Sequence, residues 1–235
     1  MTYNYDYPRP SLTVDCLVFG YDTKTQKLNI LLIQRKNEPF QNHWALPGGF
    51  VDMDESLETA AIRELKEETG AENILLEQFY TFGSPQRDPR GRVISVAYYT
   101  LISPDSIYIK AADDAKAVGW FDTKKLPPLA FDHQKILNIG LERLKTKLQS
   151  QPIGLELLPN KFLFSALQKM YESILEAEIE PQNFRKKMLT AGLLHELDKE
   201  KEQIADRLYT FDKTKYTALL KNNKDFKLKM LNFLA

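Results

Sequence analysis

The sequence contains a single cysteine, no net charge at neutral pH and no long apolar run. One cysteine excludes an internal disulfide and argues against a metal site built from thiolates. A net charge of zero provides no overall attraction to nucleic acid or to acidic partners, so any basic surface must be local. Because 43% of the residues are hydrophobic and 27% are charged, the composition is that of an ordinary globular protein with a core.

The start of the chain also lacks the pattern of a secretion signal. Residues 1–12 are rich in tyrosine and proline, and no basic stretch leads into an apolar run. We therefore expect a cytoplasmic protein that does not enter a membrane. The one cysteine, Cys16, lies within an apolar run, and we expect it to be a small buried core residue.

Short β-branched, apolar runs in the first half of the chain indicate strands. Residues 12–20 and 28–34 are two such runs, and the polar stretch between them predicts a hairpin. Residues 74–82 and 92–102 form a second block, joined by a loop that is rich in proline and arginine. The first half of the chain is therefore expected to contain a sheet.

Helical patterns interrupt these strands. From residue 56 to residue 69, apolar side chains recur at spacings of three and four, which predicts one amphipathic helix. Asp54 is the expected N-cap of this helix, and Gly70 is the glycine expected to end it. A second helix is predicted from about residue 133 to residue 148, ahead of a segment with a proline that breaks it.

The last third of the chain has a different pattern. Residues 165–176 and 181–191 are predicted to form two helices. Residues 193–197 and 207–211 are predicted to form two strands on either side of a highly charged stretch. Two helices followed by a hairpin with a long tip are typical of a winged-helix unit. The final residues, 221–235, are expected to form either a short amphipathic helix or a loose tail.

Three glutamates gather near the end of the first predicted helix. Glu67 and Glu68 follow Glu64 by three and four residues, so all three carboxylates share one helix face. Like charges at such spacings cost about 0.2–0.5 kcal/mol per pair, and the helix dipole adds a penalty in the last turn. A divalent cation such as Mg²⁺, which prefers oxygen ligands, would offset this repulsion. A solvated acidic helix face is the alternative.

The residues around these acids form a longer motif. Gly49 is followed after five residues by Glu55, and after seven more by the run Arg63-Glu64-Leu65-Lys66-Glu67-Glu68-Thr69-Gly70-Ala71. This motif resembles the signature of the Nudix hydrolases at every specified position. The resemblance implies a Nudix α/β/α sandwich with a mixed sheet in residues 1–150. Together with the winged helix-turn-helix domain that the helices and hairpin indicate for residues 151–235, we expect an α+β fold.

The resemblance also implies which residues bind metal. Glu64, Glu67 and Glu68 match the catalytic, metal-binding glutamates of the family, and the Gly48 turn brings a backbone carbonyl to the same Mg²⁺ or Mn²⁺ ion. A water held by that metal would attack one phosphorus of a pyrophosphate, while the cation neutralises the charge that builds on the phosphate oxygens.

Other residues of the motif are assigned supporting roles by the same resemblance. Arg63 and Glu55 match the ion pair that orients the loop and the helix in the family. The general base is either a glutamate of the motif or an acid on a later loop, where Asp113 and Asp114 are the candidates. Helix-capping or turn roles remain open for these two aspartates. His133 is expected to form a hydrogen bond at a helix start and not to act as a catalyst.

Residues 86–99 resemble the ADP-ribose branch of the Nudix superfamily, and especially members fused to winged-helix domains that regulate NAD or sugar-utilisation genes. Arg87 and Arg92 are the expected phosphate ligands, and Phe82 or a tyrosine is expected to stack on a base. A solvated turn is the alternative for Arg90. The resemblance therefore narrows the small-molecule partner to an ADP-ribose-like nucleoside diphosphate.

The second helix of the C-terminal part resembles the DNA-reading helix of the same regulators. Basic side chains there would bind phosphates of double-stranded DNA and polar ones would read base edges. The charge of the domain is nearly balanced, with 14 lysines and arginines against 12 aspartates and glutamates from residue 151 onward. A fold used for dimerisation or as a scaffold is the alternative. The candidate DNA-binding residues are Gln182, Arg185, Lys186 and Lys187.

Two functional hypotheses follow. The first is a Mg²⁺-dependent Nudix hydrolase of an ADP-ribose-like compound, fused to a DNA-binding winged helix. The second is a transcriptional regulator whose Nudix domain senses ADP-ribose or a sugar phosphate without cleaving it. Both hypotheses are compatible with a homodimer, which we expect by analogy with winged-helix regulators and ADP-ribose Nudix proteins.

Overall fold

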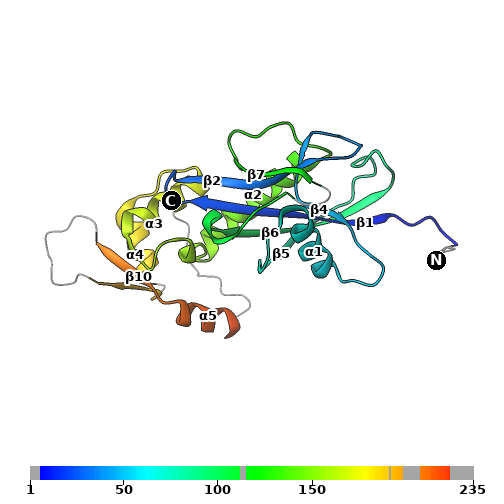
Figure 1. Cartoon of the computed structure of the whole chain (residues 1–235). Helices are drawn as coiled ribbons and strands as arrows, with labels where there is room; N and C mark the ends of the chain where they lie inside the picture. Colours follow the sequence, from blue (N-terminus) through cyan, green and yellow to red (C-terminus); the bar gives the residue numbers. More distant parts are fainter. Residues whose placement is uncertain (1–5, 112–114, 191, 198–206, 223–235) are drawn as a thin grey trace. The chain divides into compact units, whose positions relative to one another are not determined.

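A computed structural model of the 235-residue chain describes residues 6–111, 115–190, 192–197 and 207–222. The chain divides into two compact units (Figure 1). The first comprises residues 1–20 and 29–141, and the second comprises residues 21–28 and 142–235. The domain boundary expected after residue 150 stays a prediction.

A mixed seven-stranded sheet forms the centre of the first unit. Its main path runs in the order β3 (Trp44–Ala45), β2 (Lys27–Arg35), β1 (Ser11–Asp22), β6 (Val93–Ile102) and β5 (Glu77–Phe82). Strands β1 and β6 are parallel, whereas β5 runs antiparallel to β6. Two further strands pair antiparallel with this path, β4 (Gly48–Phe50) with β1 and β7 (Ala115–Asp122) with β2.

Strand β1 is covered by a helix on each face, which explains why nearly all its residues are buried. Successive side chains of a strand point to opposite faces. On one face, Cys16 is fully buried and belongs to the same core cluster as Ala61 of helix α1 (Leu57–Thr69). On the other face, a Cβ at Gly140 of helix α2 (His133–Ser150) would lie 2.2 Å from the side chain of Leu17. The prediction that Cys16 is a buried core residue is confirmed.

Helix α1 begins at a different cap from the one we expected. Asp54 is not the N-cap, because the Oγ of Ser56 accepts the hydrogen bond from the Thr59 amide at 3.1 Å. Ser56 directly precedes the first helical residue, which places its oxygen within reach of the unpaired amides of the first turn. The predicted end is confirmed, since Gly70 has a φ of 70° and its amide bonds to the Lys66 carbonyl at 2.8 Å.

Several strands of the first unit have weak sequence signals. The sequence analysis did not predict β3, β4 or β7, and the strand expected from residue 74 begins only at Glu77. Strand β7 contains alanines, a glycine and a lysine, which favour strands poorly. Its pairing with β2 from Asn29 opposite Asp122 to Arg35 opposite Ala115 sets its position. The position of β7 is therefore set by its pairing with β2 and not by the strand propensity of its own residues.

The second unit has the helices and the hairpin of a winged helix. Strand β8 (Lys161–Leu163) is followed by helices α3 (Phe164–Leu175) and α4 (Pro181–Thr190) and then by strands β9 (Leu194–Glu196) and β10 (Leu208–Phe211). The three strands form an antiparallel sheet in the order β8, β10, β9. The sequence analysis did not predict β8 or helix α5 (Lys213–Asn222). The charged tip of the hairpin, residues 198–206, and most of the expected C-terminal helix or tail, residues 223–235, lie outside the described residues.

An aromatic core holds this second unit together. The ring of Phe164 lies 5.5 Å from those of Phe184 and Tyr209, and the ring of Tyr171 lies 5.1 Å from that of Phe184. These side chains come from α3, α4 and β10, so the helices and the hairpin share one buried cluster. In neither unit does the described part of the chain contain a helix that is long and apolar enough to cross a membrane.

Candidate functional site

Two consecutive glycines allow β4 to approach both β1 and α1. A Cβ at Gly48 would lie 2.1 Å from the Val14 carbonyl oxygen of β1, and a Cβ at Gly49 would lie 2.4 Å from the Glu64 carboxylate of α1. Only glycine leaves room for these contacts. The Gly48 amide donates a hydrogen bond to the Glu68 carboxylate at 2.8 Å, which ties the loop to the helix.

The Arg63 side chain forms hydrogen bonds with three acidic side chains of this region. Its guanidinium donates to Glu55 at 2.6 and 3.0 Å, to Glu64 at 2.8 Å and to Glu67 at 3.0 Å. The hydrogen bond between the Glu55 and Arg63 side chains lowers the pKa of Glu55 and raises the pKa of Arg63. Arg63 also donates to the Phe50 carbonyl at 3.0 Å. The Arg63–Glu55 ion pair that we expected is present, and it connects the loop to α1.

We expected the carboxylates of the three glutamates of the motif to converge on one point, but they do not. Among the residues that the structure describes, no three acidic, histidine or cysteine side chains form a group that could hold a metal ion. Glu64 and Glu67 turn toward Arg63, whereas Glu68 turns toward the Gly48 amide. The guanidinium and the amide are the nearest donors, and charge-assisted hydrogen bonds to them satisfy the carboxylates.

The same residues nevertheless have the chemistry that a hard divalent cation requires. Glu55, Glu64 and Glu67 share one guanidinium, so negative charge remains in excess around Arg63. Burial raises the pKa of Glu64, and a nearby cation would stabilise its ionised form. Carboxylate oxygens on successive helical turns are ligands that Mg²⁺ and Mn²⁺ accept. The donor types suit such an ion, although the carboxylates do not meet at one point in this structure, and Glu64, Glu67, Glu68 and the Gly48 carbonyl are the proposed ligands.

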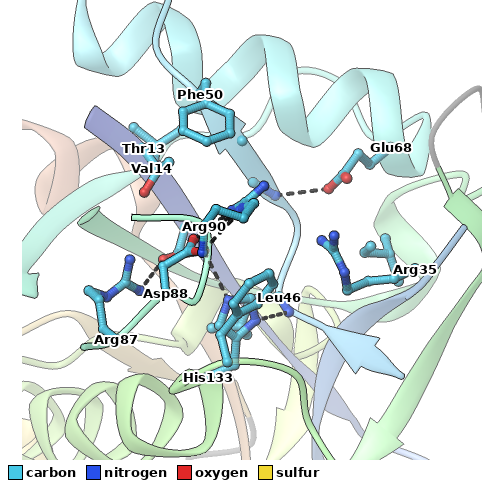
Figure 2. A pocket seen from close by; sticks show the side chains of 15 residues that line it. Thr13, Val14, Arg35, Leu46, Phe50, Glu68, Arg87, Asp88, Arg90 and His133 are labelled. Atoms are coloured by element: carbon cyan, nitrogen blue, oxygen red, sulfur yellow. Dashed lines mark hydrogen bonds and ion pairs between the residues drawn. The ribbon is translucent and has the colours of Figure 1, made fainter. Parts of the chain in front are cut away.

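Two adjoining cavities lie beside this acidic cluster. A cavity of about 400 Å³ is lined by acids of α1 and by the loop after β2. A smaller inner cavity of about 60 Å³ is lined by β1, β4, the arginine-rich loop and the start of α2 (Figure 2). Both cavities share Arg35, Phe50, Glu68 and Arg90 as lining residues. The two cavities therefore adjoin each other next to the acids of α1.

Arg87, which we expected to bind phosphate, is already paired within the wall of the inner cavity. Its guanidinium donates to Asp132 at 2.8 and 3.1 Å and to Asp15 at 3.3 Å, and its side chain is only 4% exposed. Asp15 also accepts the Ser95 hydroxyl at 2.5 Å. This network stabilises the wall of the inner cavity, which Arg87 also lines.

Arg35 and Arg90 line both cavities. The Arg90 guanidinium lies 4.8 Å from the Phe50 ring centroid and 5.1 Å from that of Phe131, and it donates to Asp88 at 2.6 Å (Figure 2). Arg35 lies 4.8 Å from the Phe131 centroid. Burial and the charge of Arg90 lower the pKa of Arg35. Arg90 lies in a turn and its side chain is 38% exposed, as the solvated alternative predicted, and it also lines both cavities.

The other predicted ligand and base residues lie elsewhere. Arg92 donates to the Gly83 carbonyl at 2.7 Å and lines neither of these cavities. Phe82 is 4% exposed and packs against Tyr80 with centroids 4.9 Å apart, which leaves little surface for a base. Asp113 and Asp114 lie outside the described residues.

Sequence reasoning missed three residues that line the inner cavity. The residues are Arg35, Phe50 and Phe131. Each had a local signal, since Arg35 directly follows the apolar run of β2 and Phe50 directly follows the glycine pair. Phe131 directly precedes Asp132 and His133, which both face the same wall.

His133 forms the hydrogen bond that we expected at the start of a helix. Its Nδ1 accepts the Leu46 amide at 2.9 Å, so the ring proton lies on Nε2, which is 3.5 Å from Asp15. Burial lowers the pKa of His133 and keeps the ring neutral. The residue thereby connects the start of α2 to the segment that leads into Gly48.

This burial predicts a pH dependence of stability. Because the folded-state pKa of His133 is lowered, its contribution is fully present above the ordinary value of about 6.5. It is lost as the unfolded chain takes up a proton at lower pH. His133→Gln should therefore lose less stability than the natural protein between about pH 7 and pH 5. Urea unfolding at a series of pH values measures this, with exposed His43→Gln as control. An equal loss in the His133 variant would contradict the assignment.

The exposed face of α4 carries part of the predicted DNA-binding set. Gln182 and Lys186 are exposed and lie one turn apart, whereas Lys187 is partly buried. Arg185 instead donates to the Tyr209 hydroxyl at 2.7 Å. Glu180 accepts the amides of the first turn, including that of Gln182 at 2.9 Å, and so caps the helix.

Comparisons with known proteins agree with both units. Residues 9–138 match the family model of the NUDIX domain, and residues 154–211 match that of the NrtR DNA-binding winged helix domain. The chain is 39% identical over 200 residues to the ADPR responsive transcriptional repressor NtrR of Acinetobacter baylyi, which covers 83% of this chain and 79% of the relative. It is 46% identical over 131 residues to the ADP-ribose pyrophosphatase of Methanocaldococcus jannaschii, which covers 56% of this chain and 73% of that protein.

A solved structure extends this similarity to three dimensions. Shewanella oneidensis NrtR complexed with a 27mer DNA has a TM-score of 0.70 and 35% identity, covering 85% of this chain and 93% of that one. The predicted α+β architecture, with a Nudix fold and a C-terminal winged helix, is confirmed. The chain belongs to the Nudix family and carries a C-terminal winged-helix domain of the NrtR type.

Proposed function

We propose that this protein is a transcriptional regulator that binds ADP-ribose, or a close nucleoside diphosphate analogue, in its Nudix unit and double-stranded DNA through its winged helix. The observation that supports this most is that one chain carries both a Nudix unit and a winged helix, with Arg35, Arg90 and Phe50 lining both of the cavities beside the acids. The NtrR relative, which is named for its response to ADPR, supports this proposal over most of the chain.

The larger of the two cavities has the size that such a ligand requires. The 400 Å³ cavity lies within the usual range of about 300–1,000 Å³ for small-molecule sites, whereas the inner one of 60 Å³ is far smaller. We therefore place the bulk of the ligand beside the acids. Arg35 and Arg90 bind the diphosphate, whose charge offsets the repulsion between the two guanidiniums. Phe50, which is 42% exposed and lines both cavities, provides apolar surface for a planar group of the ligand.

Arg90 provides a test with a control in the same loop. Arg90→Gln is expected to weaken ADP-ribose binding about 10- to 100-fold, because a hydrogen bond to a charged group contributes about 1.5–3 kcal/mol. Arg92→Gln removes the same charge two residues away, outside the cavities, and is expected to bind within about 3-fold of the natural protein. Isothermal titration calorimetry measures both. Equal weakening in the two variants would show that Arg90 is not a specific ligand.

Hydrolysis is the second candidate activity, favoured by the complete set of acids on α1 and by the similarity to the ADP-ribose pyrophosphatase. A divalent ion held by Glu64, Glu67 and Glu68 would activate a water and stabilise the phosphate charge. Arg63 orients Glu64 and Glu67, while the Gly48 amide holds Glu68. Release of AMP from ADP-ribose with Mg²⁺ or Mn²⁺ tests this activity. A protein that binds ADP-ribose with either metal and releases no AMP would be a sensor only.

DNA binding has a direct test of its own. A labelled duplex from the region upstream of the protein's own gene should bind the full chain more tightly than a shuffled duplex, and affinity should fall steeply with salt. Equal affinity for the two duplexes would contradict sequence-specific regulation. We also propose a homodimer, which sedimentation equilibrium of the full chain tests.

A further inference from the structure

Arg185 lies in the middle of α4, yet its guanidinium faces the hairpin formed by β9 and β10. Its Nη2 donates to the Tyr209 hydroxyl at 2.7 Å and lies 3.6 Å from the Glu196 carboxylate. The guanidinium carbon lies 5.7 Å from the centroid of the Tyr209 ring. The side chain is 34% exposed, so about two thirds of it is covered. An arginine that reads DNA would extend from the helix instead.

The partners of Arg185 form a fixed network on the hairpin. Tyr209 is fully buried in the aromatic core, and its hydroxyl lies 3.3 Å from Glu196. Glu196 on β9 also accepts a hydrogen bond from Arg207, just before β10. Burial alone would raise the pKa of Glu196, but Arg207, Tyr209 and Arg185 together lower it, so the carboxylate stays ionised. Two arginines and one tyrosine thus converge on a single carboxylate.

Other polar residues of α4 differ from Arg185 in their exposure to solvent. Gln182 and Lys186 are exposed and occupy one face of α4, because residues four apart lie one turn above each other. Arg185 lies toward the adjacent face, which packs on the hairpin near β10 (Figure 1). The helix therefore has one face for solvent and one arginine that fixes its orientation.

We propose that Arg185 is a positioning residue, which anchors α4 to the hairpin through Tyr209 and Glu196 and thereby presents Gln182 and Lys186 to DNA. It does not itself bind a base or a phosphate. This inference rests on the DNA binding proposed above and deepens it, because it separates the residues that contact DNA from the residue that orients them.

Salt dependence distinguishes the two roles. Loss of a phosphate contact reduces the slope of log affinity against log salt by about one, whereas loss of a positioning contact leaves the slope unchanged. Tyr209→Phe is the sharpest variant, since it removes only a buried hydroxyl that cannot reach DNA. If Arg185 acts through this hydroxyl, Tyr209→Phe must reproduce the effect of Arg185→Gln.

The experiment measures DNA affinity of the full chain at several salt concentrations for Arg185→Gln, Tyr209→Phe, the double variant and Lys186→Gln. The first two should each weaken specific binding about 5- to 10-fold with an unchanged salt slope, which corresponds to one lost hydrogen bond. The double variant should be no weaker than either single variant. Lys186→Gln should reduce the slope by about one.

Three results would overturn the proposal. In the first, Arg185→Gln reduces the salt slope as Lys186→Gln does while Tyr209→Phe binds like the natural protein. In the second, the two losses add in the double variant. In the third, neither single variant changes affinity. Thermal unfolding of the natural protein, the two single variants and the double variant reports the Arg185–Tyr209 coupling without DNA. Absence of DNA binding by the natural protein would therefore refute the proposed function and leave this contact measurable.

Discussion

Replacing Glu67 with glutamine is expected to reduce AMP release from ADP-ribose at least about 100-fold, the usual effect of removing one group that stabilises transition-state charge. Glu67 is one of the carboxylates that share the Arg63 guanidinium, and its side chain is 56% exposed toward solvent. Glutamine keeps the size of the side chain but removes a charged metal ligand. The loss should therefore appear in turnover with Mg²⁺ and not in the thermal stability of the protein.

Glu72 provides the matched control for this variant. It lies just beyond α1, where it forms an exposed ion pair with Lys66 at 2.8 Å. Glu72→Gln removes the same charge and is expected to retain turnover, since an exposed ion pair contributes at most about 1 kcal/mol to stability. If Glu67→Gln retained turnover, or if Glu72→Gln lost as much, the assignment of Glu67 to the metal site would be wrong.

Replacing Phe184 with alanine is expected to destabilise the winged helix by about 3–5 kcal/mol, which is the usual cost of emptying a buried aromatic site. Phe184 is fully buried and contacts the rings of Phe164 and Tyr171. Small domains have a total stability of about 5–15 kcal/mol, so this loss removes a large share of it. Thermal unfolding should shift to lower temperature, and DNA binding at 37 °C should be lost.

Leu189 on the same helix is the control for Phe184. Its side chain is exposed, so Leu189→Ala should change stability by less than about 1 kcal/mol. A Phe184→Ala protein with natural stability would mean that the aromatic cluster does not hold α4. A Leu189→Ala protein that is as unstable would mean that the loss does not come from the buried core.

Sequence spacing predicted the elements whose signals are local. The end of α1 at Gly70 and the start of α4 at Pro181 follow from residues that favour those positions. Asp54 was predicted as N-cap because several polar residues precede α1, and only the backbone path decides which side chain reaches the Thr59 amide. Strand β7 was missed because its pairing with β2 is not visible in its own residues.

In the candidate site, too, features that depend on one continuous segment were predicted, and features that depend on distant segments were not. The motif predicted the Arg63–Glu55 pair and the close approach of the glycine loop, because both depend on residues within one continuous segment. It did not reveal that Arg87 is paired with Asp15 and Asp132, since these come from distant parts of the chain. Arginines of one loop look alike in sequence, and only the fold separates the one that is buried from the one that faces a cavity.

We propose that this chain binds both an ADP-ribose-like ligand and DNA, and that binding of the ligand changes the affinity for DNA. The most direct test titrates ADP-ribose into the complex of the full chain with its upstream duplex at fixed salt, and measures DNA affinity by fluorescence anisotropy. We expect affinity to change about 5- to 150-fold at saturating ligand, with a reciprocal change in ADP-ribose affinity when DNA is bound. DNA affinity that stays constant while calorimetry shows ADP-ribose bound would contradict the account.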